Sequence, residues 1–162
     1  EEGNNHNLTH CGMHAMDTMR MENGFLHWGH DISPEENQYQ AGLDFAISYK
    51  KNVDFLGKEA LLKIKDKKIQ KKMIMLTLKD KKPGDPLLLH DEPIYLDDRI
   101  IGRTTSGNYS FNFNKNLTFG YVNKDFNNLD TSKHKIYVEV GKVKYEAEYL
   151  QKALNQNNYK TI

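Results

Sequence analysis

The chain has 162 residues, of which 38% are hydrophobic and 28% are charged, and its formal net charge is +1 at pH 7. This length suits one medium domain or two small units, and the composition is that of a globular protein with a polar surface. The near-zero charge argues against a nucleic-acid or membrane-surface protein, the single cysteine excludes an internal disulfide framework, and no apolar run approaches the ~20 residues that span a bilayer.

One α-helix is expected near the start of the chain. The pattern predicts it over residues 13–22, with Gly24 as its stop. Ala15, Met19 and Glu22 follow the i, i+4, i+7 spacing that places side chains on one face of a helix. We therefore expect this face, including Glu22, to point into the protein.

The residues that follow predict a strand and a second helix. Within residues 41–49, the apolar side chains of Leu43, Phe45 and Ile47 alternate with their neighbours, and a period of two is typical of a strand. Residues 58–66 carry apolar side chains at helical spacing, which predicts a helix there.

From about residue 70 onward, short strands separated by turn residues dominate. Asp97-Asp98 and Gly141-Lys142 each lie between two strand patterns and predict hairpins. The expected strands are residues 73–78, 93–96, 99–105, 117–122, 136–140 and 143–149. Regular short strands of this kind favour a small antiparallel barrel or sandwich, and no α-helix is expected beyond residue 90 apart from a short turn at the tail.

The change of pattern near residues 66–70 divides the chain into two expected units. Residues 1–66 should form the end of a mixed helix and strand domain, and residues 67–162 a domain of antiparallel strands, so the expected fold class is α+β. The chain opens without an initiator methionine or a secretory signal and runs almost at once into a helical pattern. We therefore expect it to be part of a longer protein.

Few patterns in the chain are typical of a metal site or a nucleophile. His10 and His14 are four residues apart, and His27 and His30 are three apart, which suits zinc, but no cluster of Cys or carboxylate residues supplies the remaining ligands. No metal site is therefore expected. Ser106 follows a strand without a nucleophile elbow around it, and we expect it to be structural rather than catalytic.

Glu22 is the side chain that most suggests a binding role. It lies in the last turn of the predicted helix, where the helix dipole disfavours a carboxylate. One interpretation is a surface glutamate, or one that pairs with a nearby lysine. The other is a carboxylate that recognises a flat heterocycle through two N–H donors. Asp17 and Arg20, three residues apart, are expected to form an ion pair on the same helix.

An ordered set of motifs resembles a known family. Residues 11–31, Cys-Gly-Met-His-Ala-Met-Asp-Thr-Met-Arg-Met-Glu-Asn-Gly-Phe-Leu-His-Trp-Gly-His-Asp, resemble the folate-module helix of dimethylglycine and sarcosine dehydrogenases. The blocks that follow are Ala41-Gly-Leu-Asp44, Asp54-Phe-Leu-Gly-Lys-Glu-Ala-Leu61, Glu92-Pro-Ile94, Ile101-Gly-Arg-Thr-Thr-Ser-Gly107 and Phe119-Gly-Tyr-Val122. The glycine-cleavage T-protein, an aminomethyltransferase, shares this framework.

The resemblance implies the C-terminal part of a folate-binding aminomethyltransferase domain, followed by a small β-barrel. In the relatives, the glutamate at the position of Glu22 binds the pterin ring of tetrahydrofolate. By the same resemblance Lys51, His14 and Trp28 are folate-site candidates. T-proteins place a folate-contacting arginine near Lys51, and the dehydrogenase branch often has tyrosine in place of His14. T-proteins usually carry Tyr-Gly where this chain has Trp28-Gly29, and this difference favours the dehydrogenase-fused branch.

The function implied is capture of a one-carbon unit, taken from an N-methyl amine such as dimethylglycine or sarcosine, as 5,10-methylene-tetrahydrofolate. The catalytic aspartate of the family and the FAD domain of the fused enzymes are expected upstream, so no catalytic residue is assigned and the chain alone is expected to be inactive. One alternative is a T-protein, which would work with a lipoyl carrier protein, or a related folate-dependent demethylase. A third is a non-catalytic folate-binding protein.

The expected partners are a small-molecule folate and an amine substrate, with neither nucleic acid nor a membrane. The lone cysteine, Cys11, fits a reducing compartment. The cytoplasm, or the mitochondrial matrix in a eukaryote, is therefore the expected location.

Overall fold

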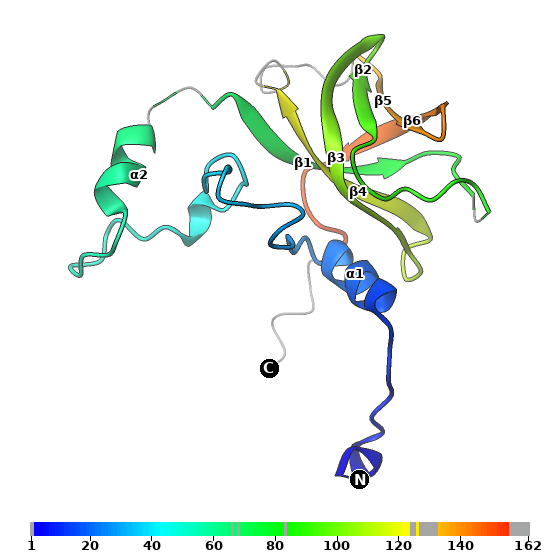
Figure 1. Cartoon of the computed structure of the whole chain (residues 1–162), viewed down its shortest axis with the longest axis horizontal. Coiled ribbons are helices and arrows are strands. Elements are labelled where there is room, and N and C mark those ends of the chain that lie inside the picture. Colours follow the sequence, from blue (N-terminus) through cyan, green and yellow to red (C-terminus); the bar gives the residue numbers. More distant parts are fainter. Residues whose placement is uncertain are drawn as a thin grey trace.

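Six antiparallel strands close into a barrel in the C-terminal half of the chain, and two α-helices precede it (Figure 1). The computed structural model describes residues 2–65, 67, 69–82, 84–123, 126 and 133–155. The helical elements are η1 (Glu2–His6), α1 (Met13–Glu22), η2 (Asp44–Ala46) and α2 (Lys58–Lys65). The strands are β1 (Lys71–Leu78), β2 (Pro93–Leu96), β3 (Arg99–Ser110), β4 (Lys115–Asn123), β5 (Ile136–Val140) and β6 (Val143–Leu150).

The barrel has the strand order β1-β4-β3-β2-β5-β6, and β6 pairs back onto β1. Three of its connections are hairpins, β2–β3, β3–β4 and β5–β6. Two of these are the hairpins predicted at Asp97-Asp98 and Gly141-Lys142, where Asp97 and Lys142 take the positive φ angles that tight hairpin turns require. The prediction of an antiparallel barrel is confirmed, and the described residues beyond 90 form no α-helix.

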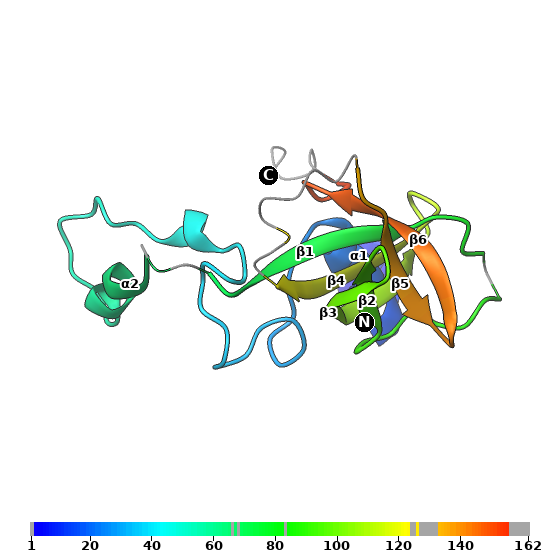
Figure 2. The ribbon, with the colours of Figure 1, turned by 90° about the horizontal axis from the view of Figure 1, so that it is seen from above.

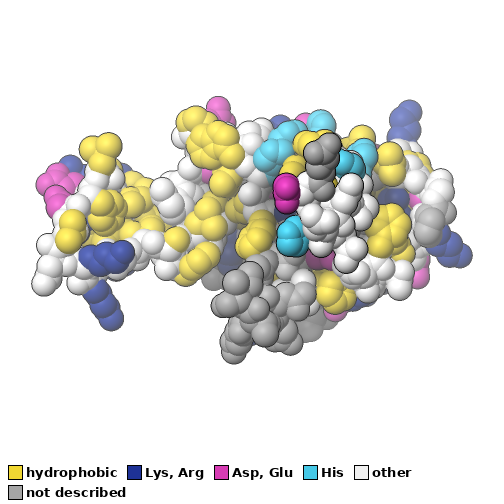
Figure 3. Space-filling view, turned by 90° about the horizontal axis from the view of Figure 1, so that it is seen from below, with side chains coloured by type: hydrophobic (Ala, Val, Ile, Leu, Met, Phe, Trp, Pro, Cys, Tyr) yellow, Lys and Arg dark blue, Asp and Glu magenta, His cyan; other side chains and the backbone are white. Residues whose placement is uncertain are grey.

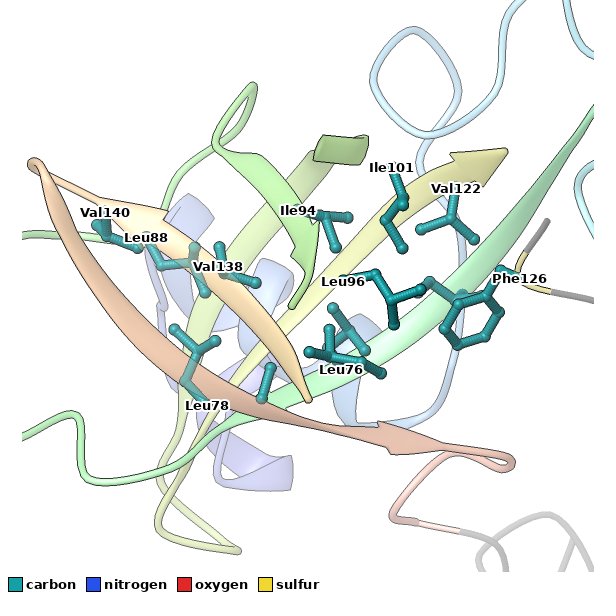
Figure 4. Close-up of a cluster of buried hydrophobic side chains, with 13 residues drawn as sticks. Leu76, Leu78, Leu88, Ile94, Leu96, Ile101, Val122, Phe126, Val138 and Val140 are labelled. Carbon is teal, nitrogen blue, oxygen red and sulfur yellow. The ribbon is translucent and has the colours of Figure 1, made fainter. Parts of the chain in front are cut away.

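The hydrophobic core fills the interior of the barrel (Figure 4). Alternate side chains of each strand point inward, because successive residues of a strand face opposite sides of a sheet. The fully buried members include Leu76, Ile94, Val122 and Val138, each from a different strand. A smaller cluster, which contains Met21 of α1 and Leu117 of β4, attaches the helix to the outside of the barrel.

The two α-helices are related to the barrel in different ways. α1 lies against β3 and β4, whereas α2 and the segment that leads to it stand apart from the strands (Figures 1 and 2). Both helices lie within a residue of their predicted bounds. None of the helices in the described residues is long and apolar enough to cross a bilayer.

The strand predicted over residues 41–49 is wrong. This segment forms local turns and the short helix η2. In the turns before η2, the Ala41 and Leu43 amides donate to the carbonyls of Asn37 and Gln38. Gly42 has a φ of 71°, which breaks an extended backbone. Phe45 is 82% exposed, so the alternation of apolar residues here does not reflect a buried sheet face.

The predicted inner face of α1 is also wrong, although Glu22 does point inward. Ala15 and Met19 are exposed, and the buried residues of the helix are Thr18, Met21 and Glu22. Methionines lie on both sides of this helix, so apolar spacing alone does not distinguish the side that meets β3.

Gly102 permits the close approach of β3 and β4, and its replacement should weaken the barrel. A Cβ atom at this position would lie 1.9 Å from the backbone oxygen of Tyr121, which is held in the strand ladder. We expect Gly102→Ala to lower the free energy of unfolding by about 1–3 kcal/mol, as overpacking does. Urea unfolding followed by circular dichroism measures it. Ile100→Ala, at an exposed position of the same strand, should stay within about 0.5 kcal/mol of wild type, and an equally small effect at Gly102 would contradict the prediction.

Candidate functional site

The inner face of α1 is joined to β3 and the turn after it by a series of polar contacts, which we call the α1–β3 seam. The Thr18 hydroxyl donates to the Tyr109 carbonyl at 3.1 Å, and the Asn108 side-chain amide donates to the His14 carbonyl at 3.1 Å. The remaining contacts of the seam involve the charged side chains of Arg20 and Glu22. The seam therefore fixes α1 on the outside of the barrel by hydrogen bonds as well as by apolar packing.

The Glu22 carboxylate lies at the end of α1 and is 1% exposed. The Ser110 hydroxyl donates to its Oε1 atom at 2.7 Å, and the Asn112 side-chain amide donates to its Oε2 atom at 2.7 Å. Ser110 is itself held, because its Oγ atom accepts a hydrogen bond from the Phe113 amide at 3.2 Å. A buried carboxylate needs such donors, since burial without partners is costly.

A second charged group of the seam surrounds Arg20. Its guanidinium contacts Asp17 at 2.7 Å, Asp31 at 2.9 Å and the Ser106 hydroxyl at 2.9 Å, which confirms the predicted Asp17–Arg20 pair. The Asp31 side chain is fully buried and also accepts hydrogen bonds from the Thr105 hydroxyl and the His27 amide. Arg20 therefore neutralises a buried carboxylate and links α1, the loop after it and β3.

An open groove of about 750 Å³ begins beside the C-terminal end of α1. Asn23 and Gly24, which follow Glu22, form part of its wall, and Lys72 of β1 and Lys152 supply its charged groups. Its other lining is largely apolar, from Phe25, Leu26, Ile32, Leu43, Met73, Met75, Phe119 and Leu150. A flat heterocycle with an apolar face suits such a wall. The Glu22 carboxylate faces the β3–β4 hairpin rather than the groove.

The structure does not bring the four predicted folate-site residues together. His14 lies on the exposed part of α1 and joins the seam through its carbonyl oxygen. Trp28 is 65% exposed in the loop after α1. Lys51 lies between η2 and α2, where it lines a different cavity of about 720 Å³ with Val53, Phe55 and Leu56. Of the four, only Glu22 is buried.

A polar cavity of about 440 Å³ lies on the other side of the loop after α1. Lys71 contacts Glu36 at 2.5 Å there. Burial alone would raise the pKa of Glu36, but the hydrogen bonds from Lys71 and Ser33 outweigh this effect, so the pKa of Glu36 is lowered. Tyr121 lines the same cavity, and its hydroxyl is buried without a hydrogen-bond partner. Burial, with the charges of Glu36 and Asp31, raises the pKa of this hydroxyl. No cluster of three metal-ligating side chains occurs among the described residues.

The outer face of α1 and the neighbouring loops carry exposed apolar side chains. Met13, Met16 and Met19 all project from this face, and Phe25 and Trp28 follow in the loop. Figure 3, which views the molecule from the α1 side, shows hydrophobic and histidine side chains gathered over this region. Monomeric proteins rarely expose large contiguous apolar patches, so a surface of this kind favours contact with further protein.

Sequence reasoning missed the residues that hold the two carboxylates of the seam. Ser110 and Asn112 are separated from Glu22 by 88 and 90 residues, and Thr105 from Asp31 by 74. Nothing in their local pattern marks them. Ser110 and Asn112 lie at a hairpin turn, where serine and asparagine are common for other reasons, and Thr105 lies within β3.

Two family models match the chain. The model described as the GCVT N-terminal domain matches residues 1–51, and the one described as the glycine cleavage T-protein C-terminal barrel domain matches residues 71–154. The second match coincides with the six strands of the barrel.

The chain is also similar to several curated enzymes. The chain is 43% identical over 109 residues to a 4-methylaminobutanoate oxidase (formaldehyde-forming) of Paenarthrobacter nicotinovorans, with 67% of this chain and 13% of the relative covered. It is 32% identical over 154 residues to the mitochondrial dimethylglycine dehydrogenase of Rattus norvegicus, with 94% of this chain and 17% of the relative covered. It is 35% identical over 122 residues to an aminomethyltransferase of Symbiobacterium thermophilum, with 75% of this chain and 32% of the relative covered. The chain thus spans from about an eighth to a third of the length of these relatives.

A solved structure shares the fold. The crystal structure of the glycine cleavage system aminomethyltransferase T from Bartonella henselae superposes with a TM-score of 0.70 at 22% identity. The match covers 86% of this chain and 37% of that one.

Proposed function

The chain belongs to the glycine cleavage T-protein family, and we propose that it is the folate-recognising C-terminal portion of a tetrahydrofolate-dependent one-carbon-transfer enzyme. In this proposal residues 1–66 are the end of the folate-binding domain and residues 67–162 the barrel domain. The one-carbon unit would come from an N-methyl amine of the dimethylglycine or sarcosine type and leave as 5,10-methylene-tetrahydrofolate.

The observation that carries the proposal is the Glu22 carboxylate at the end of α1. It is a buried charge at the disfavoured end of a helix, held in place by two hydrogen bonds of 2.7 Å. An ionised carboxylate has about four lone-pair sites, so it can accept hydrogen bonds from a ligand as well as from the protein. The pterin edge offers an amino group and a ring N–H, and a carboxylate can accept both side by side.

The groove beside Glu22 suits the rest of such a ligand. Its apolar wall would pack against the part of the ligand beyond the pterin edge that Glu22 holds, and Lys72 and Lys152 could neutralise a carboxylate of the folate tail. We propose His14, Trp28 and Lys51 as further contacts of the folate site. These three are exposed, so their contribution depends on protein packed against the outer faces of α1 and the η2–α2 segment.

Chemistry on the one-carbon unit is assigned to parts of the protein outside this chain. When bound, tetrahydrofolate supplies the nitrogen atoms that receive the carbon. A general acid or base typically contributes about 10²–10⁴-fold to a reaction rate. The charged groups of the seam are already occupied, because Glu22 is bonded to Ser110 and Asn112, and Arg20 is paired with Asp31. The proposed role of this chain is therefore to bind and orient folate, with FAD in a preceding domain if the enzyme is a dehydrogenase.

The runner-up function is that of a T-protein, which would receive its carbon unit from a lipoyl carrier protein. The 35% identity to an aminomethyltransferase supports it. Turnover with dimethylglycine or sarcosine and an electron acceptor separates the two, since a T-protein would show none. A folate-binding protein without catalytic activity would bind tetrahydrofolate but form no methylene-tetrahydrofolate from either carbon donor.

Replacing Glu22 tests the proposal. We expect Glu22→Gln to weaken tetrahydrofolate binding by very roughly 5- to 150-fold, because the new NH₂ group meets a pterin donor and a charge-assisted bond is lost, each at a cost of about 1–3 kcal/mol. Calorimetry on the natural full-length protein measures the affinity. Glu35→Gln, at an exposed position, is the matched control and should bind as wild type does. If Glu22→Gln changed the affinity for tetrahydrofolate by less than twofold while the fold stayed intact, the pterin would have to bind at another part of the protein.

A further inference from the structure

The two oxygens of Glu22 are held by side chains of different character. Ser110 ends β3 and is 1% exposed, and its hydroxyl is fixed from behind by the Phe113 amide. Asn112 lies in the turn between β3 and β4 and is exposed, although its amide reaches inward to Oε2. One donor is thus built into the barrel, whereas the other belongs to a surface turn.

A ligand cannot reach the carboxylate while both donors and their surroundings keep these positions. Glu22 is 1% exposed, and the groove beside it is lined by the residues that follow it rather than by its carboxylate. The backbone carbonyl of Glu22 is also engaged, by the Asn155 amide at 2.9 Å. Of the groups that touch the carboxylate, the Asn112 side chain is the one that solvent can already reach.

We propose that Ser110 positions the Glu22 carboxylate for its ligand, and that Asn112 occupies Oε2 as a donor which the ligand replaces. This inference rests on the proposed function, since the ligand class is a heterocycle with adjacent amino and ring N–H donors. The Asn112 amide presents one such N–H to the same oxygen, at the same kind of distance that a pterin would use. The β3–β4 turn therefore satisfies the buried charge in the empty protein and yields it to the ligand.

The two roles predict opposite effects on affinity. Without the Asn112 amide, the ligand no longer competes for Oε2, so Asn112→Ala should tighten tetrahydrofolate binding by about fivefold, the effect of removing one net competing hydrogen bond. Without the Ser110 hydroxyl, the carboxylate loses its fixed orientation, so Ser110→Ala should weaken binding by about fivefold. Residues with a purely structural role would weaken binding in both variants.

The test is calorimetric titration of the natural full-length protein and its variants with tetrahydrofolate, and separately with pterin alone. Asn114→Gly is the matched control on the same turn. Asn114 accepts a hydrogen bond from the Tyr109 hydroxyl rather than contacting Glu22, and its φ of 51° suits glycine. It should bind both ligands as wild type does. Melting curves check that each variant is folded. If Ser110→Ala is not folded, the inference is judged by whether Asn112→Ala tightens or weakens ligand binding.

The outcomes separate this inference from the proposed function. Tighter tetrahydrofolate binding by Asn112→Ala supports both. Binding that is unchanged or weaker in Asn112→Ala overturns the exchange of donors while leaving the function in place. If no form binds tetrahydrofolate but Asn112→Ala binds pterin more tightly than wild type, the function fails and the inference stands. Absence of binding to either ligand in every form overturns both.

Discussion

Arg20→Met is expected to lower the free energy of unfolding by about 3–5 kcal/mol, the usual cost of removing one partner from a buried ion pair. The Asp31 side chain is fully buried, and Arg20 is its cationic partner at 2.9 Å. Methionine keeps most of the packing of the arginine stem but leaves this carboxylate uncompensated. The Thr105 hydroxyl and the His27 amide still donate to Asp31, so we expect a value toward the lower end of that range.

Urea unfolding of the 162-residue chain, followed by circular dichroism, measures the effect of Arg20→Met. Arg103→Met is the matched control, because the Arg103 side chain is 75% exposed and lies 3.4 Å from Asp91, whose side chain is 62% exposed. Exposed pairs contribute about 0–1 kcal/mol. If both variants lost less than about 1 kcal/mol, the seam would not be a principal attachment of α1.

Leu76→Ala should destabilise the barrel by about 2–5 kcal/mol. Leu76 is 0% exposed at the centre of the barrel, among side chains from the other strands (Figure 4). Truncation removes buried apolar surface and leaves a cavity, and a closed barrel has little freedom to collapse around it. The expected cost is therefore in the upper half of that range.

The measurement for Leu76→Ala is again the unfolding midpoint and slope in urea. Leu87→Ala, at a position 73% exposed in the loop before β2, is the control and should change stability by less than about 0.5 kcal/mol. A loss at Leu76 no greater than that at Leu87 would mean that the barrel interior is not the main source of stability.

The barrel could be predicted because its information is local. Strands of the C-terminal half alternate between inner and outer side chains and are separated by turn residues, so each is marked by its local sequence, although β3 extends to Ser110, beyond the predicted residues 99–105. The order of motifs then identified the family, which the match to the C-terminal barrel domain over residues 71–154 bears out. Helix α1 was predicted with its bounds because Gly24 ends a clear helical pattern.

Prediction failed where a short pattern had more than one solution. Residues 41–49 alternate as a strand would, but within the described part of the chain they pair with none of the strands, and turns form instead. On α1, methionines occur on both sides of the helix, so the predicted inner face contained Met19, whereas the observed inner face contains Thr18 and Met21. Glu22 was correctly placed inward, yet with the wrong companions.

The sequence by itself determined the family, the barrel and the helix that carries Glu22, because these depend on periodicity, turn residues and ordered motifs. Only the tertiary structure decided what surrounds that carboxylate. Ser110 and Asn112 reach Glu22 across 88 and 90 residues, and Arg20 meets Ser106 across 86, through a contact between a helix and the outside of a barrel. No local pattern encodes such a contact, because a hydrogen bond between distant segments depends on how whole elements pack rather than on the residues beside each partner.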